Sequence, residues 1–430
     1  MSCRLTRRSL TVAALSLVLL AGADWTRFRG PNGSGVSGDK GLPTTWSATE
    51  NVVWKTPLPG YGSSTPITLG KKIFLTCYSG YGLDKDDPGS QANLKLHVVC
   101  LDRGSGKILW DKPIKPRLPE EDFDAGCISL HGYASFTPVT DGEAIYVFFG
   151  RSGAFAFDLD GKQLWSRLLG SKTNVWGSAA SPVLAGDILV VNACVETGSI
   201  QGTPTVKNGT LFGLNKKTGE MAWQAEGIND SWSTPALVDL PGGKQELVLS
   251  MKDKTLGFEP ATGKKLWECD SVPDYVCPMT VVDGDVVYIS GGRTPVTVAI
   301  RGGGRGDVTE SHCLWKARKA TKVPSPLVAG GLLYWIDHTG LACCLDAKTG
   351  DIVYRERTGL KKVYASLVLA DGKLYTVSRT SGAIVYAAGR EFKELARNHL
   401  GDDSVFDATP VVSNGQLLLR SNKFLYCIGK

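Results

Sequence analysis

Short runs of alternating hydrophobic and polar residues fill the chain, and they return in the same order about every 45 residues. Each copy opens with a small residue, mostly Ser or Thr and usually followed by proline, and continues into an apolar strand that ends at Gly or Asp-Gly. The eight openings are Thr65-Pro66-Ile67, Thr137-Pro138-Val139, Ser181-Pro182-Val183, Thr234-Pro235-Ala236, Cys277-Pro278-Met279, Ser325-Pro326-Leu327, Ser366-Leu367-Val368 and Thr409-Pro410-Val411. A fixed period of this length predicts a propeller or a solenoid.

Each copy then continues through three further strands. The second strand is typified by residues 144–148 and the third by residues 96–101, and a Gly-containing turn leads into a fourth strand that carries tryptophan. Four short strands joined by Gly-rich turns predict one antiparallel blade. The tryptophans are large enough to fill the gap between two blades, so we interpret them as packing residues. They are Trp110, Trp165, Trp223 and Trp267, and the weaker later copies have Trp315, Tyr354 and Leu395 at this place.

The last copy stops after three strands, and its missing tryptophan strand is found at the other end of the chain. Residues 51–55 contain Trp54 and precede the first proline strand. This segment should complete the last blade and so remove the free sheet edge. The pattern therefore predicts an all-β, eight-bladed β-propeller of four-stranded antiparallel blades over residues 49–430, with an N-terminal extension at 24–48.

Residues 1–23 have the features of a secretory signal peptide. Arg4, Arg7 and Arg8 precede an apolar run at 10–20, and Ala21-Gly22-Ala23 offers a small-residue cleavage site. The pair Arg7-Arg8 leaves export by the general or by the twin-arginine route open. No later segment reaches the roughly 20 apolar residues of a spanning helix. We expect an exported protein, periplasmic or extracellular, that is soluble after cleavage.

Neither the net charge nor the cysteine content indicates a nucleic-acid-binding protein or a disulfide-rich one. The formal charge of +6 falls to +3 when Arg4, Arg7 and Arg8 leave with the signal peptide, and this balance does not indicate a nucleic-acid partner. An exported chain with many cysteines invites a disulfide interpretation. However, Cys100, Cys344 and Cys427 occupy the same apolar position of the repeat, where cysteine serves as a small buried hydrophobe.

The turn at the end of the third strand resembles the tryptophan-docking motif of the pyrroloquinoline quinone (PQQ) propellers. It is found from Leu101-Asp102 to Trp110, from Phe157-Asp158 to Trp165 and from Leu345-Asp346 to Tyr354. The segment from Trp25 to Gly35 is similar to the opening of secreted, uncharacterised PQQ-like repeat proteins. This resemblance implies the quinoprotein dehydrogenase-like propeller fold. It leaves function open, since the superfamily includes alcohol dehydrogenases and also scaffolds such as the propeller lipoprotein of the outer-membrane β-barrel assembly machine.

One face of the propeller collects aromatic and basic residues. The links between blades and the turns between second and third strands lie on this face, which we call the mouth. Seven links carry an aromatic residue, and six turns carry a basic one. The aromatic residues are Tyr61, Tyr133, Trp176, Trp232, Tyr275, Tyr364 and Phe406, and the basic ones are Arg151, Lys252, Arg293, His338, Arg379 and Arg420.

Two interpretations of these residues stay open. Aromatic faces stack on planar or pyranose rings and arginine forks match oxyanions, so the set could bind an anionic or carbohydrate-like ligand. Alternatively, the aromatic residues plug the channel and the basic residues are ordinary solvated charges. Two insertions on the same face, 78–93 and 111–130, contain several acidic residues and could form a lid or a solvated decoration.

The sequence favours a binding protein over an enzyme. The alternative, a PQQ- and calcium-dependent dehydrogenase of alcohols or sugars, requires a calcium site, and Glu196, Asn174, Asn229 and Asp230 form only a loose candidate set. Cys343-Cys344 lies inside a strand, where neighbours face opposite sides, so a disulfide between them is not expected. We expect no catalytic residue, metal or cofactor, and a ligand or protein segment bound at the mouth.

Overall fold

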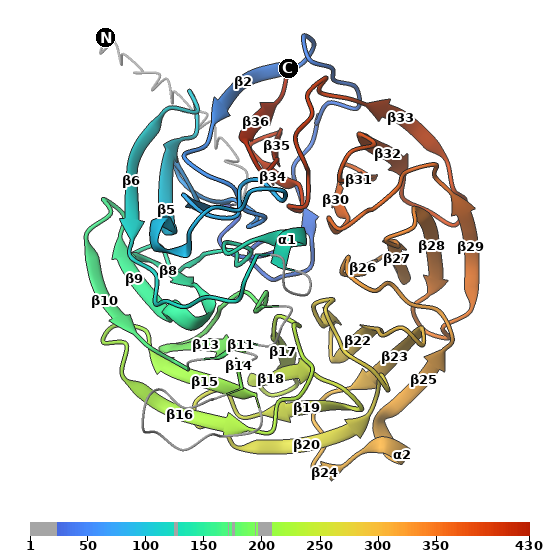
Figure 1. Ribbon diagram of the computed structural model, residues 1–430. Coiled ribbons are helices and arrows are strands. Elements are labelled where there is room, and N and C mark those ends of the chain that lie inside the picture. Colours follow the sequence, from blue (N-terminus) through green and yellow to red (C-terminus); the bar gives the residue numbers. More distant parts are fainter. Residues whose placement is uncertain (1–23, 124–127, 171, 174–176, 194, 197–208) are drawn as a thin grey trace, which may run out of the picture.

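The computed structural model describes residues 24–123, 128–170, 172–173, 177–193, 195–196 and 209–430. Within these residues, eight antiparallel sheets surround a central axis as blades, which Figure 1 shows as a closed ring. The eight-bladed propeller predicted from the repeat is therefore confirmed. The predicted signal peptide at 1–23 lies outside the described residues. In the described part of the chain, no helix is long and apolar enough to cross a membrane.

The blades are numbered in chain order, and each runs from an inner first strand to an outer fourth strand (Figure 1). Blade 1 contains β3 (Ile67–Leu69), β4 (Lys72–Ser79), β5 (Lys95–Asp102) and β6 (Ile108–Ile114). Blade 2 contains β7 (Val139–Thr140), β8 (Ala144–Phe148), β9 (Ala154–Asp158) and β10 (Gln163–Arg167). Blade 3 contains β12 (Val183–Ala185), β13 (Ile188–Asn192), β15 (Thr210–Asn215) and β16 (Met221–Glu226). Blade 4 contains β17 (Ala236–Leu240), β18 (Lys244–Ser250), β19 (Lys254–Phe258) and β20 (Lys265–Asp270).

The second half repeats the arrangement. Blade 5 contains β21 (Val281–Asp283), β22 (Val286–Gly291), β23 (Val296–Arg301) and β25 (Cys313–Ala317). Blade 6 contains β26 (Leu327–Ala329), β27 (Leu332–Ile336), β28 (Leu341–Asp346) and β29 (Ile352–Arg357). Blade 7 contains β30 (Val368–Ala370), β31 (Lys373–Val377), β32 (Ala383–Ala387) and β33 (Glu394–Asn398). Blade 8 contains β34 (Val411–Ser413), β35 (Gln416–Arg420), β36 (Phe424–Ile428) and the N-terminal β2 (Val52–Pro57).

Short elements complete the fold. The strand β1 (Val36–Ser37) adds to blade 7 in parallel, β24 (Gly306–Asp307) adds to blade 4 in parallel, and β11 (Lys172–Thr173) pairs with β14 (Val195–Glu196). The helices are the 3-10 turns η1 (Gln91–Asn93) and η2 (Gly150–Ser152) and the single α-turns α1 (Ile128–His131) and α2 (Thr309–His312).

The ring closes through the N-terminal strand, as the missing last turn predicted. In blade 8, β2 pairs antiparallel with β36 and places Trp54 opposite Cys427. The same cross-strand position joins Trp110 to Cys100 and Tyr354 to Cys344. All three cysteines are fully buried free thiols, which confirms their interpretation as small core residues opposite a large aromatic ring.

The outer seams between blades are held by tryptophan. In five blades, the indole Nε1 donates a hydrogen bond of 2.9–3.2 Å to a backbone carbonyl of the next blade. The face of the same ring covers a glycine of that blade's turn, and a Cβ on Gly219 would lie 2.6 Å from the Trp165 ring. Glycine is thus required both for its positive φ and for the close approach of the ring. The five tryptophans are Trp54, Trp110, Trp165, Trp223 and Trp315.

Three blades depart from this pattern. Blade 5 replaces the glycine turn by an insertion, and Trp267 of blade 4 instead donates to the buried carboxylate of Glu246 at 2.8 Å. Tyr354 packs edge-on against Phe392, with ring centroids 5.9 Å apart. In blade 7 the residue at the tryptophan position is Ala396, which lies opposite Val385. The prediction that Leu395 takes this place was wrong by one residue, and Leu395 is exposed.

The inner seams are held by the hydroxyl groups that open each repeat. At six seams, a backbone N–H at the start of one blade donates to the hydroxyl that opens the next blade, at 2.9–3.1 Å. These N–H groups precede the first strand and have no ladder partner there, so the hydroxyl satisfies a buried donor. The acceptors are Thr137, Ser181, Thr234, Ser325, Ser366 and Thr409. The repeated hydroxyl therefore joins neighbouring blades by a hydrogen bond.

The fifth opening is displaced from its predicted place. Its first strand begins at Val281, and the N–H that reaches Ser325 belongs to Met279. Met279-Thr280 therefore occupies the position that we assigned to Cys277-Pro278, because the proline made the earlier pair the better sequence match.

The segment at 24–37 runs across the inner strands at the end of the channel opposite the mouth. Trp25 is buried and exchanges hydrogen bonds with Thr68 of blade 1, while Thr26 accepts one from Thr140 of blade 2. Arg29 is fully buried and donates to the Pro326 carbonyl of blade 6, and burial lowers its pKa to about 9. Beyond it, β1 pairs with blade 7. The segment thus tethers blades 1, 2, 6 and 7.

The tryptophan seams predict a specific cost for filling the glycine turn. Gly219→Ala should destabilise the protein by about 1–3 kcal/mol more than Gly186→Ala, because only the first added methyl collides with an indole ring. Both glycines are in blade 3 and both have positive φ, +71° and +61°, so the backbone penalty is matched. The midpoints of urea unfolding measure the difference. Equal losses would contradict the proposed role of the seam.

Candidate functional site

A chamber of about 430 Å³ occupies the centre of the propeller on the mouth side. Its floor contains Phe28 of the N-terminal segment and the hydroxyl residues of the inner seams. Its walls contain aromatic residues of the links, and Leu130 and His131 of α1 lie at its edge. Figure 1 shows α1 close to the middle of the ring. The chamber is thus backed by the chain's own N-terminal segment on the side away from the mouth.

Three of the predicted aromatic residues line this chamber: Trp232, Tyr275 and Tyr364. Trp232 donates from its indole Nε1 to the Gly177 carbonyl at 2.7 Å, which fixes the ring. Tyr275 meets it edge to face, with centroids 6.2 Å apart. Together these rings present large, rigid apolar faces with polar edges, a composition typical of binding surfaces.

Two of the predicted arginines support the chamber aromatics and are paired with carboxylates. Arg293 lies over Tyr275, with 5.4 Å from its guanidinium carbon to the ring centroid, and bonds Asp274 at 2.9 Å. Arg379 lies over Tyr364 at 4.8 Å and approaches Asp407 to 3.2 Å. The hydrogen bonds from Arg293 hold the pKa of Asp274 well below its usual range. The positive charges of Arg293 and Arg379 are therefore largely compensated by acids of the same face.

Asp407 is a chamber carboxylate that the sequence pattern did not single out. Burial raises its pKa to about 6, and the charge of Arg379 opposes this shift. The ion pair is close, but the Asp407 Oδ1 atom accepts no well-aligned hydrogen bond from the described residues. The Asp407 side chain is consequently less strongly held than that of Asp274.

Other predicted residues lie away from the chamber lining. Tyr61 packs edge-on against Tyr78, and Tyr133 is buried against Tyr78 and Tyr81. Lys252 is exposed to solvent. Arg151 lies partly buried in η2, and its charge acts on Glu120. Trp176 lies outside the described residues.

The assignment of Arg420 to the mouth is corrected by its burial. Arg420 ends β35 with 1% of its surface exposed, and its guanidinium donates to the Ser64 and Thr76 carbonyls and to Ser64 Oγ. It joins blade 8 to blade 1 beneath the surface. Both terminal nitrogens of its guanidinium are occupied and the whole side chain is buried, so Arg420 does not offer its charge to a ligand in the chamber.

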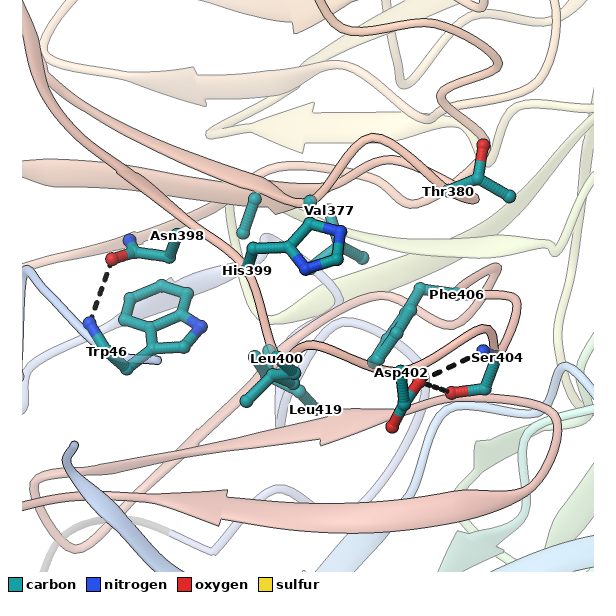
Figure 2. A pocket seen from close by; sticks show the side chains of 12 residues that line it. Trp46, Val377, Thr380, Asn398, His399, Leu400, Asp402, Ser404, Phe406 and Leu419 are labelled. Carbon is teal, nitrogen blue, oxygen red and sulfur yellow. Dashed lines mark hydrogen bonds between the residues drawn. The ribbon is translucent and has the colours of Figure 1, made fainter. Parts of the chain in front are cut away.

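Phe406 lies beside a small crevice between blades 7 and 8, shown in Figure 2. Trp46 covers one side of the crevice, and its backbone N–H donates to Asn398 Oδ1 at 2.8 Å. The crevice measures about 20 Å³, which is room for about one water. Phe406 therefore packs a seam, against Tyr426 at 5.9 Å, and does not line the chamber.

The two insertions form one packed cap beside the mouth. The second begins after β6 and so four residues later than the predicted 111. Gln91 of the first loop donates to Asp122 of the second at 2.9 Å, and the Phe123 N–H donates to the Tyr81 hydroxyl at 3.0 Å. Burial raises the pKa of Glu120 to about 8, although Arg151 opposes the shift. The cap positions α1 at the chamber.

Lys322, which the sequence pattern did not single out, also lines the chamber. It lies in the link before β26, the only link for which no aromatic residue was predicted. His338, a predicted residue, lines the same chamber from the turn between β27 and β28 of that blade. The sequence signal that could have indicated Lys322 is that its link lacks the aromatic residue predicted for the other links.

The described lining does not fit a calcium-bound quinone. Calcium takes six to eight oxygen ligands with several carboxylates, whereas Asp407 is the one carboxylate among the described lining residues, and it is paired with Arg379. Asn229 and Asp230 of the loose calcium set are not among the chamber residues, and Asn174 and the Glu196 side chain are not described. Cys343 and Cys344 are free thiols in separate core clusters.

Comparison with protein families identifies this repeat. Residues 95–356 match the family described as outer membrane protein assembly factor BamB. The chain belongs to this family. The PQQ-like propeller resemblance inferred from the docking motif is thereby confirmed.

Relatives and solved structures agree with this membership. BamB of Burkholderia pseudomallei is 26% identical over 370 residues, covering 75% of this chain and 84% of that protein. BamB of Yersinia pestis is 21% identical over 308 residues, covering 67% and 72%. The crystal structure of BamB from Moraxella catarrhalis superposes with a TM-score of 0.60 at 13% identity, over 88% of this chain and 97% of that one, and shows the same fold.

The buried carboxyl of the cap predicts a pH-dependent stability. Since the folded-state pKa of Glu120 is raised from 4.5 to about 8, its contribution is fully present below pH 4.5 and is lost as the pH rises through 8. Glu120→Gln should therefore flatten the decline in melting temperature between pH 5 and 8.5. Thermal unfolding across this range tests it, with exposed Glu143→Gln as the control. An unchanged slope in Glu120→Gln would contradict the assignment.

Proposed function

We propose that this chain is an exported, non-catalytic binding propeller that holds a segment of another protein in its mouth chamber. The family membership supports this proposal, since the matching relatives are named as assembly factors for outer membrane proteins. Such a role needs a rigid scaffold with a recognition surface and no reacting groups. The ring fastened at inner and outer seams supplies the rigidity.

The observation that carries the proposal is the chamber itself. A volume of about 430 Å³ lies within the usual range of ligand pockets, roughly 300–1,000 Å³. The rings of Trp232, Tyr275 and Tyr364 are fixed by a hydrogen bond or by a stacked arginine. Rigid aromatic anchors of this kind dominate the energy of protein recognition. The hydroxyl groups below can bond the polar backbone of an inserted segment. A few side chains of a peptide would fill this space.

A small anionic or carbohydrate-like ligand is the second candidate from the same residues. Aromatic walls above a floor of hydroxyls also suit a pyranose ring. Such a ligand would have to be held by the predicted arginines, but Arg293 and Arg379 already pair with acids. A protein segment is therefore the better candidate. The dehydrogenase alternative is disfavoured by the poor fit of the lining to calcium, and added PQQ with Ca²⁺ should not raise the melting temperature of the purified protein.

Selection of peptides tests the proposal. Displayed random heptapeptides should yield sequences that bind the protein from Asp24 onward, and Tyr364→Ala should weaken them at least tenfold because the chamber loses an anchor, a loss of about 1.4 kcal/mol. Tyr61→Ala is the matched control, since it removes a link tyrosine outside the chamber lining. Fluorescence anisotropy measures the affinities.

Three results would count against a protein segment. Peptides that bind Tyr364→Ala as well as the parent would place the interaction elsewhere. Binding to a glycan array that is lost in Tyr364→Ala, with no peptide recovered, would favour the sugar candidate. A Ca²⁺-dependent stabilisation by PQQ together with dye-coupled alcohol oxidation would establish the dehydrogenase.

A further inference from the structure

The chamber has an uneven distribution of charge. Three links line the chamber with an aromatic residue, namely Trp232, Tyr275 and Tyr364, but the link of blade 6 places Lys322 and Val323 at the lining. His338 faces the chamber from the same blade. The flanking links contribute Tyr275 from blade 5 and Tyr364 from blade 7. Two basic groups are thus framed by two aromatic rings.

Unlike Arg293 and Arg379, these two basic groups form no ion pair with a carboxylate of the described residues. Within the described part of the chain, the Lys322 ammonium has neither a hydrogen bond nor an ion pair, and the side chain is half-buried. The Nδ1 atom of His338 is buried and has no hydrogen-bond partner among the described residues. Arg293 and Arg379, in contrast, each contact a carboxylate.

Burial, more than the neighbouring charges, disfavours the protonated form of His338. Burial is the main cause of its lowered pKa, Lys322 lowers it further, and Asp337 of the same turn opposes them. Of the other titratable groups of the chamber, Asp407 is paired with Arg379 and His131 contacts Ser135. An anion beside Lys322 would therefore meet one uncompensated charge and one imidazole that can gain a proton.

We propose that Lys322 and His338 form an anion subsite of the chamber, which binds a carboxylate of the inserted segment while Tyr275 and Tyr364 contact its neighbouring apolar groups. The inference rests on the proposed function and narrows it to acidic segments. The carboxylate belongs either to an acidic side chain or to a chain end.

The test compares matched peptides. Peptides selected as above should contain an acidic residue or require a free C-terminus, and exchanging Glu for Gln, or amidating the end, distinguishes the two sources. We expect the neutral twin to bind at least tenfold more weakly to the parent protein and equally well to Lys322→Met. Lys361→Met, an exposed lysine of the next link, should retain the difference.

The imidazole gives a separate readout. Affinity for the acidic peptide should rise between pH 7.5 and 5.5 and should lose this dependence in His338→Gln, because a bound carboxylate raises the pKa of His338. If peptides bind but their charge has no effect, the subsite is refuted while the proposed function stands.

If no peptide is selected, the proposed function fails. The subsite is then tested with glucuronate against glucose by NMR of the His338 ring. A shift with glucuronate that is absent in Lys322→Met supports the subsite, and no shift refutes it.

Discussion

The propeller depends on one hydrogen bond that is repeated at six seams, from a backbone N–H at the start of one blade to the hydroxyl that opens the next. A single such bond contributes only about 1 kcal/mol net, but an unsatisfied buried N–H would cost about 1–3 kcal/mol. Six of these bonds run around the inner wall between Thr137 and Thr409. They fix the spacing of the first strands and hence the width of the chamber. The tryptophan seams then fix the outer circumference.

The same bonds explain why the floor of the chamber is polar while its walls are aromatic. A hydroxyl that joins two blades points along the inner wall, so blades 2, 3, 4, 6, 7 and 8 contribute polarity at one depth. The links above this depth are free of ladder constraints and can carry rings such as Tyr275 and Tyr364. The arginines behind those rings act as supports. Their pairing with Asp274 and Asp407 allows a cation to lie close to the chamber without leaving it strongly positive.

The repeat predicted the fold well because period, turn chemistry and the tryptophan position all derive from local sequence. Eight blades, closure through Trp54 and the buried cysteines followed from it. The candidate site was only partly predictable. Register alone places a residue on a face but does not give its depth, so Arg420 was grouped with the mouth although its donors point into the seam with Ser64. Ion pairs such as Arg379 with Asp407 join different loops and require coordinates, and Lys322 could be found only as an exception to the aromatic pattern.

The N-terminal segment has a consequence for how the chain reaches this structure. Residues 24–57 lie near the start of the chain, yet Arg29 bonds the Pro326 carbonyl, β1 pairs with Leu369, and β2 pairs with the last strand. Their binding places do not exist until blades 6 to 8 have been made. The N-terminal segment can therefore reach its final position only after blades 6 to 8 have formed. The loop between the two ends is long, and closing it is entropically costly and slow. Floor formation and ring closure are thus expected as late, coupled steps of folding, so that the chamber acquires its shape only when the whole ring is complete.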